Sequence, residues 1–269
     1  MKPLYSPGID GNCLPPWIGA ALKTRQAQAL ILGRDWRDCR DSGKHAIAGF
    51  ESFNFATAQI WKAAAAGDPY ADLALLRLEA ALADARAEQR RMSGDLGHLA
   101  GTVAEAAPEP GAGIVAPAYP ERVPPLPANP YGHLGSCRLA DFDGLVVAIL
   151  SAWQRGGIDR KQAYLMIRNA GRVVRRIFCL PHTVWRHTGV TRQDIQRKTP
   201  LARQAEGVYT KLGVTAIPAD VLQGFRHGRY APAKAANQPR AARKRKRDAH
   251  HSRPRDIDGN RKIPMESIR

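Results

Sequence analysis

Cysteine is scarce and scattered in this sequence. The four cysteines in 269 residues lie far apart, and none belongs to a Cys-x-x-Cys pair. This usage fits reduced thiols in a cytosol better than a disulfide framework. Long apolar runs are missing too, since no stretch reaches the roughly 18 residues that a membrane helix requires. The first residues lack the apolar core of a signal peptide. We therefore expect a cytoplasmic protein with no membrane contact.

Catalytic and metal-binding motifs are also lacking. Residues 41–45 (DSGKH) resemble a phosphate-binding loop, but Asp38 replaces its leading glycine and no Ser or Thr follows the lysine. Cys179, His182 and His187 lie close together without the fourth ligand of a structural zinc site. The spacings of strand-exchange enzymes and relaxases are absent. We expect no catalytic residue, no cofactor and no metal, and hence a protein that is not an enzyme.

Positive charge is what the sequence has in excess, and it lies in the second half. The formal net charge is +17. Residues 1–154 hold 14 Lys and Arg against 16 Asp and Glu, residues 155–230 hold 15 against 4, and residues 231–269 hold 12 against 4. A basic region followed by a basic tail is typical of a protein that binds polyanions. Nucleic acid is the expected partner, and a merely solvated basic surface is the alternative.

Composition divides the chain into five segments. The sequence predicts an irregular arm at 1–19, a strand with a helical hairpin at 20–92, and a Pro/Gly-rich linker or insertion at 93–127. A basic helical domain at 128–230 and a disordered basic tail at 231–269 follow. The expected fold is mainly α with a small β component.

Cap signals predict the helices. One helix is expected over Phe50–Ala66, followed by the turn Gly67-Asp68-Pro69-Tyr70 and a second helix to about Met92. A third is expected over about Ala140–Trp153, and a fourth begins after Asp159, with Gln162 completing a capping box. A further helix should start at Thr191. The expected buried face of the fourth helix comprises Leu165, Met166, Ala170, Val173, Val174 and Ile177.

The fourth helix also carries a basic stripe. Arg168, Arg172 and Arg175 are spaced to lie opposite the buried face, as expected for phosphate contacts or for a solvated surface. The other candidate DNA-binding cations are Arg176, Arg192, Lys244, Arg245, Lys246 and Arg247.

Leu22–Leu32 is ambiguous, because its alternation fits a strand and its apolar spacing fits a helix almost as well. This segment is also one of several short motifs that together resemble a known protein family. The motifs are LKTRQAQ at 22–28 with Gly33-Arg34, GDPYAD at 67–72, ANPY at 128–131, GRVVRR at 171–176 and GVTRQD at 189–194. In this order they resemble a protein family found on integrating conjugative elements and related plasmids. That family is grouped with the AcaB-type transcriptional activators.

The resemblance implies a dimeric DNA binder of ribbon-helix-helix character. A strand from each subunit would pair into a ribbon that enters the major groove, and Leu22–Leu32 would supply it, with Lys23 and Arg25 facing the bases. The implied function is regulation of element genes by a homodimer on double-stranded DNA in the bacterial nucleoid, alongside other element-encoded regulators. One alternative is a DNA-binding accessory protein of the transfer or element-processing machinery. Another is an RNA binder led by the tail.

Overall fold

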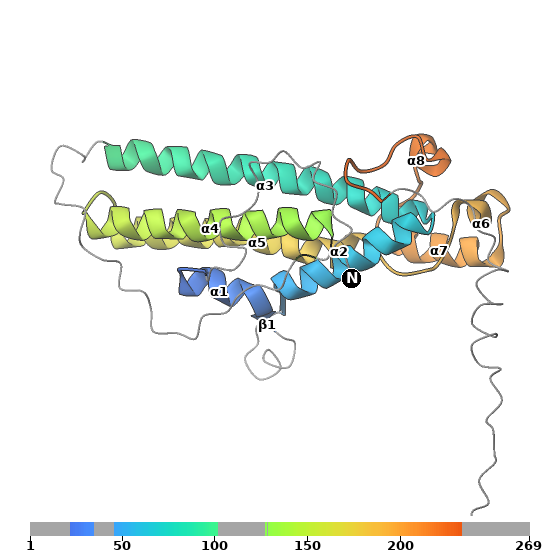
Figure 1. The fold of residues 1–269 in the computed structure, drawn as a ribbon, viewed down its shortest axis with the longest axis horizontal. Coiled ribbons are helices and arrows are strands. Elements are labelled where there is room, and N and C mark those ends of the chain that lie inside the picture. Colours follow the sequence, from blue (N-terminus) through green and yellow to red (C-terminus); the bar gives the residue numbers. More distant parts are fainter. Residues whose placement is uncertain (1–21, 35–45, 102–126, 128, 233–269) are drawn as a thin grey trace, which may run out of the picture. The chain divides into compact units, whose positions relative to one another are not determined.

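The fold is mainly helical, as expected, with one small antiparallel sheet. The computed structural model describes residues 22–34, 46–101, 127 and 129–232. Within them are eight helices and two short strands, shown in Figure 1. In chain order they are α1 (Arg25–Leu32), β1 (Gly33–Arg34), β2 (Ile47–Ala48), α2 (Phe50–Ala65), α3 (Pro69–Gly101), α4 (Pro130–Gln154), α5 (Arg160–Val184), α6 (Arg192–Gln196), α7 (Pro200–Lys211) and α8 (Ala219–Gln223).

Three long helices, α3, α4 and α5, pack against one another along their lengths (Figure 1). The α4 and α5 helices are antiparallel, since only the turn at 155–159 joins them. The α3 helix runs parallel to α4, because the Gln89 side chain donates to the Arg138 carbonyl and Glu79 lies near Tyr131. The α2 helix packs on all three, and α1 packs on α2 and α4. One hydrophobic core therefore joins the segments 22–101 and 129–232.

An aromatic cluster holds α2 against α4 and α5. The Phe53 and Phe178 ring centroids are 5.1 Å apart, and those of Phe50 and Phe178 are 5.8 Å apart. Gly135 of α4 makes room for this cluster, because a Cβ atom there would lie 2.2 Å from the Phe53 ring. Any side chain at that position would push α4 away from α2.

Of the two alternatives for Leu22–Leu32, the strand is wrong, and the helix is confirmed over Arg25–Leu32. The Thr24 side chain accepts the amide of Ala27 and so caps α1, whose residues Ala27, Leu30 and Ile31 are buried on one face. The alternation that suggested a strand thus reflects a short helix with a narrow apolar stripe. The only sheet among the described residues pairs Gly33 with Ala48 and Arg34 with Ile47 within the chain. A ribbon built from Leu22–Leu32 is excluded.

Gly33 explains how α1 turns directly into β1. Its φ of +75° lies in the left-handed region, which glycine adopts without strain. A Cβ atom would also lie 2.1 Å from the carbonyl oxygen of Ile47 on the paired strand. The close approach of the two strands therefore depends on glycine at this position.

Most of the predicted caps are confirmed. The Asp68 carboxylate accepts the first-turn amides of Tyr70 and Ala71, and Pro69 begins α3. Asp159 and Gln162 form the capping box of α5. Thr191 caps α6 in the same way, with Asp194 as its partner.

Two predicted boundaries are wrong. The α3 helix continues nine residues beyond Met92 to Gly101, where Leu96 is still buried, so the expected linker does not begin at residue 93. The α4 helix begins at Pro130 rather than near Ala140. Asn129 starts it, because its side chain accepts the amide of Gly132 and donates to the Thr57 hydroxyl on α2. In both places tertiary contacts extend a helix beyond its local sequence signal.

Candidate nucleic-acid interface

The α5 helix contains no acidic residue. Its 25 residues include six Lys and Arg, and the nearest carboxylate in sequence is the capping residue Asp159. Among the described residues, no salt bridge joins an α5 arginine to a carboxylate. The charges of α5 are therefore not neutralised within its own sequence, and they remain available to an anion.

Four of these cations form one exposed row, which we call the basic face: Lys161, Arg168, Arg172 and Arg176. Residues four apart on an α-helix are about 40° apart around its axis, so Arg168, Arg172 and Arg176 share one side. The row extends over about 22 Å at a rise of about 1.5 Å per residue. Several DNA phosphates lie within such a length, since each strand has one per about 3.4 Å of axis.

Arg175 lies beside this row rather than in it. Its side chain is half-buried, folds back over Gly171, and donates to the carbonyl oxygen of Arg168. Burial lowers the pKa of Arg175, and the nearby charges of Arg172, Arg34 and Arg168 lower it further. Arg176, not Arg175, therefore continues the stripe predicted from the sequence. The expected apolar face needs one correction as well, because Leu165 is 42% exposed.

A groove between α3 and α5 adjoins the basic face. It has a volume of about 330 Å³ and an apolar floor of Met92 and Val173. Arg91, Arg172 and Arg176 lie around it. The one carboxylate there, Glu88, is 3.2 Å from the Arg91 guanidinium. The groove thus brings a cation of α3 to the cations of α5, which the sequence alone did not predict.

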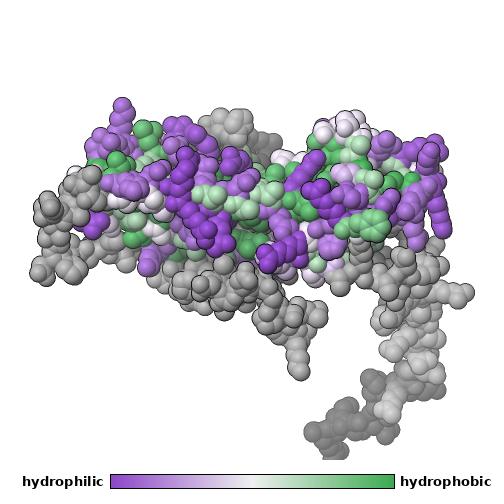
Figure 2. All heavy atoms as spheres, turned by 90° about the horizontal axis from the view of Figure 1, so that it is seen from above, coloured by the Kyte–Doolittle hydropathy of each residue, from purple (hydrophilic) through white to green (hydrophobic). Residues whose placement is uncertain are grey.

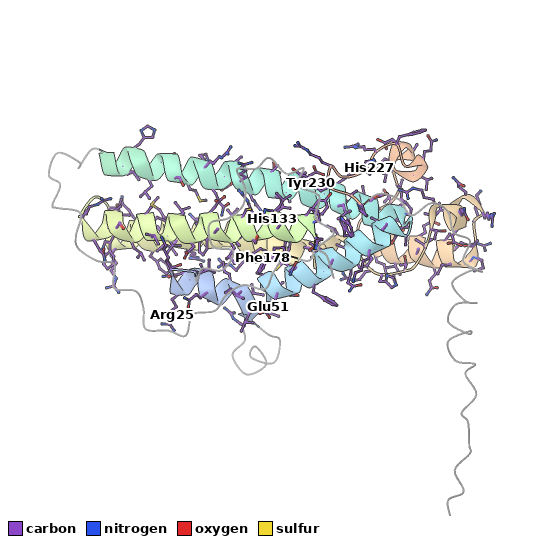
Figure 3. The ribbon with its side chains drawn as sticks, viewed as in Figure 1. Arg25, Glu51, His133, Phe178, His227 and Tyr230 are labelled. Atoms are coloured by element: carbon purple, nitrogen blue, oxygen red, sulfur yellow. The ribbon has the colours of Figure 1, made fainter. Side chains whose placement is uncertain are left out.

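Lys23 and Arg25 do not join this surface. Their side chains are exposed, but α1 lies on the other side of α4 and α5 from α3 (Figures 1 and 3). The backbone amide of Lys23 is used within the fold, where it donates to the Asp143 carboxylate over 2.8 Å. The structure therefore separates these two residues from the arginines of α5.

Arg192 is engaged inside the fold. Its guanidinium forms a hydrogen-bonded ion pair with Asp72 of α3, and only 15% and 3% of the two side chains are exposed. Its backbone amide donates to the Gly67 carbonyl over 3.2 Å. Arg192 thus fastens α6 to the turn between α2 and α3, and we leave it out of the basic face.

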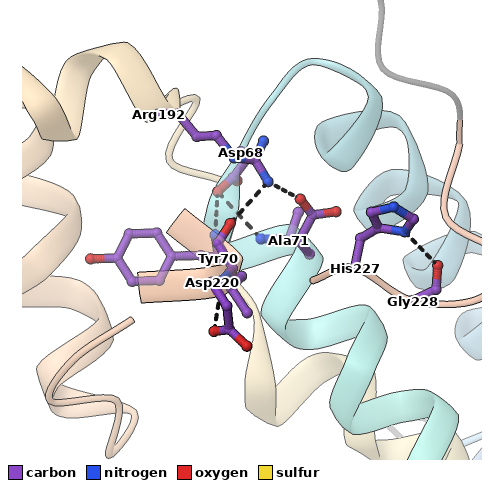
Figure 4. A network of polar contacts seen from close by, with 9 residues as sticks. Asp68, Tyr70, Ala71, Arg192, Asp220, His227 and Gly228 are labelled. Atoms are coloured by element: carbon purple, nitrogen blue, oxygen red, sulfur yellow. Dashed lines mark hydrogen bonds and ion pairs between the residues drawn. The ribbon is translucent and has the colours of Figure 1, made fainter. Parts of the chain in front are cut away.

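Asp68 stands at the centre of this junction (Figure 4). Besides capping α3, its carboxylate accepts the indole N–H of Trp185 over 3.4 Å. Burial raises the pKa of Asp68 from 3.8 to about 6, against the lowering effect of the Ala71 and Tyr70 amides. Next to it the Tyr70 and Tyr209 rings stack, with centroids 3.8 Å apart, so α3 and α7 meet here.

The raised pKa predicts how stability should change with pH. Since the folded protein binds the Asp68 proton more tightly than the unfolded chain, its contribution to stability is lost as pH rises from about 4 to 6. The loss is about 3 kcal/mol for a shift of about two pKa units. Asp68→Asn keeps the cap and removes the charge, so its free energy of unfolding should gain on the wild type over this window. Urea titrations of both proteins at several pH values measure the difference, and parallel pH profiles would contradict it.

His182 has a structural role in α5. Its Nε2 lies 2.9 Å from the Ser52 hydroxyl on α2, and burial and the nearby Arg186 lower the pKa of its imidazole.

Within the described part of the chain, no cluster of three or more His, Cys, Asp or Glu side chains could hold a metal ion. In the same part, no helix is long and apolar enough to cross a membrane. Lys244, Arg245, Lys246 and Arg247, like the loop at 41–45, lie outside the described residues.

Comparison with known proteins decides the family. The family model described as transcriptional regulator AcaB matches residues 14–234. The chain belongs to the AcaB family. The match covers every described helix and both strands, the basic face included. Members of this family are transcriptional regulators, so the chain has a DNA-binding regulatory role and is not an enzyme. No curated protein and no solved structure matches the chain.

Proposed function

We propose that this AcaB-family protein binds double-stranded DNA through the basic face of α5 and thereby regulates genes of an integrating conjugative element. The observation that carries the proposal is the exposed row of cations on a helix without a single acidic residue. A row of this kind meets phosphates well, because neutralising them releases counterions from the duplex. Arg172 and Arg176 also line the α3–α5 groove, where Glu88 pairs with Arg91 rather than with them.

The basic face supplies affinity more than sequence recognition. Arginines that meet phosphates hold a protein on the duplex, whereas sequence is read at base edges or through DNA shape. Lys244, Arg245, Lys246 and Arg247 add further phosphate contacts from the tail. The four residues are consecutive, follow Arg243 and are followed by Asp248.

The assembly and the cellular setting belong to the same proposal. Resemblance to the AcaB-type activators supports a homodimer that works on the nucleoid in the bacterial cytoplasm, with other element-encoded regulators. Because α1 occupies Arg25–Leu32, the dimer is not held by a ribbon built from Leu22–Leu32. Immunoprecipitation of the tagged protein should recover promoters of element genes. Uniform recovery of DNA together with transfer proteins would instead indicate an accessory protein.

The basic face can be tested with one triple variant. Changing Arg168, Arg172 and Arg176 to Gln should weaken duplex binding at least about tenfold, and the slope of log K against log salt should flatten by about 2.7 if three phosphate contacts are lost. Fluorescence anisotropy at several salt concentrations measures both quantities. The melting temperature should stay near that of the wild type, because these side chains are exposed.

A matched control comes from α3. Arg77, Arg86 and Arg90 are equally exposed, but Glu79, Asp84, Glu88 and Asp95 balance their charge on the same helix. Replacing those three arginines by Gln changes the net charge by the same amount and should change the slope far less. Equal effects of the two triple variants would mean that net charge alone drives binding and would overturn the assignment to α5.

A further inference from the structure

Near the C-terminal end of the described residues, an exposed phenylalanine lies in a segment that hydrogen bonds hold in place. Residues 224–231, which we call the strap, follow α8 and run past α3 (Figure 1). Phe225 of the strap has 81% of its surface exposed, more than any other large hydrophobic residue in the described part of the chain. An exposed phenylalanine lacks the about 1.5–3 kcal/mol of stabilisation that burying its side chain would give. Its exposure therefore does not stabilise the fold.

The strap is held against three helices. The Trp61 indole of α2 donates to the Tyr230 carbonyl over 3.0 Å, and the Arg229 amide donates to the Glu79 carboxylate of α3 over 2.8 Å. Gly228 lies so close to Tyr131 of α4 that a Cβ atom would be 2.2 Å from the hydroxyl oxygen. These contacts fix the position of the strap on the core. Figure 3 shows His227 and Tyr230 near the N-terminal half of α3.

The residue itself is anchored at its backbone. The amides of Phe225 and Arg226 both donate to the Asp220 carbonyl, over 2.8 and 3.1 Å, which closes the end of α8. The exposed Phe225 side chain thus extends from a main chain that is already held in place. Binding a partner there would cost little backbone entropy. A rigid aromatic side chain of this kind is a typical binding anchor.

Charge indicates what the ring could bind. Arg226, His227 and Arg229 follow Phe225 in the strap, and all three side chains are exposed. Two carboxylates are close. Asp220 lies 3.6 Å from the Arg226 guanidinium, with both groups facing solvent, and Glu79 accepts the Arg229 amide. The Arg229 guanidinium lies over the Tyr230 ring, 5.5 Å from its centroid. An exposed apolar ring next to two arginines in the chain suits a phosphate-bearing ligand that also offers flat apolar faces.

We infer that Phe225 inserts into a base step of the bound DNA duplex, while Arg226 and Arg229 contact the flanking phosphates. Apolar side chains of several DNA-binding proteins act in this way, partly unstacking two base pairs and bending the duplex. Flexible pyrimidine–purine steps such as TA yield most easily. This inference rests on the proposed DNA binding and adds to it a second contact, with bases rather than phosphates, on a different element.

The test uses the full chain and a short duplex with 2-aminopurine in several TA steps. The fluorescence of 2-aminopurine rises when it is unstacked, so saturating wild-type protein should increase it. Phe225→Ala should abolish the rise even at saturation and weaken binding about 5- to 150-fold, as expected for one lost aromatic–base contact. Phe225→Trp should preserve the rise, because indole can also insert between bases.

Phe55→Ala is the matched control. Phe55 is 67% exposed on α2, and its helix carries both Glu51 and Lys62. This variant should bind and unstack DNA as the wild type does. If Phe225→Ala behaves like Phe55→Ala, the insertion is refuted.

Other outcomes separate this inference from the proposed function. A steep salt slope without a fluorescence rise in the wild type would leave DNA binding standing and refute the insertion. A flat salt slope would refute both. If Phe225→Ala changes only the self-association of the protein in light scattering, the exposed ring is a protein contact and the insertion is likewise refuted.

Discussion

Replacing Asp72 by Asn should lower the free energy of unfolding by about 3 kcal/mol, because removing one partner of a buried ion pair leaves the other without a counter-charge. Asp72 is 3% exposed, and the Arg192 guanidinium that would be left behind is 15% exposed. The Val221 carbonyl, 3.4 Å from that guanidinium, cannot replace a carboxylate. Urea unfolding measures the loss, and the midpoint should fall with little change in slope.

Arg192→Gln should cost a similar amount, and the double variant should lose less than the sum of the two, since both changes remove the same interaction. Arg203→Gln on α7 is the control, because its side chain is exposed and its effect should be small. Well below its unfolding temperature, Arg192→Gln should keep the wild-type affinity for DNA. A fully stable Arg192→Gln protein with weakened DNA binding would return this residue to the interface.

Asp143→Ala should detach α1 at a cost of at least about 3 kcal/mol, since each hydrogen bond to a charged group contributes about 1.5–3 kcal/mol. The Asp143 carboxylate accepts three of them, from the Lys23 amide, the Thr24 amide and the Thr24 hydroxyl, over 2.8, 2.9 and 2.6 Å. Its charge also faces the positive N-terminal end of α1. Hydrogen exchange should show the amides of α1 losing protection before those of α3 and α5.

Asp84→Ala provides the comparison, because Asp84 is an exposed aspartate of α3. It should leave both stability and the exchange of α1 nearly unchanged. The Asp143→Ala variant should still bind DNA with a steep salt slope, since the basic face is on α5. Loss of DNA binding together with α1 would mean that Lys23 and Arg25 carry the interface after all.

Short-range chemistry explains what the sequence predicted well. A cap joins a side chain to amides two or three residues away, so the starts of α3, α5 and α6 could be derived from Asp68, Asp159 and Thr191. The exposure of Arg168 and Arg172 followed from helical spacing in the same way, whereas Arg175 proved half-buried. These features depend on neighbours along the chain and not on the rest of the fold.

Long-range contacts explain what the sequence missed. The α4 helix starts early because Asn129 binds Thr57, and α1 is fixed by Asp143, some 120 residues away. Arg192 looked like a surface cation, but its partner Asp72 lies at a similar separation. Phe225 could have been noticed from the alternation of aromatic and basic residues in FRHGRY at 225–230. Its exposure, however, depends on where α8 and the strap lie.

The absence of acidic residues on α5 has a cost for the folded protein without DNA. Burial lowers the pKa of Arg175 most, and the charges of Arg172, Arg34 and Arg168 lower it further. Arg168 and Arg172, which attract phosphates, therefore also repel the cations beside them. Dissolved anions screen that repulsion, and they compete with DNA for the same charges. Salt therefore acts in opposite directions on folding and on DNA binding. It raises the stability of the folded protein and lowers the affinity for DNA.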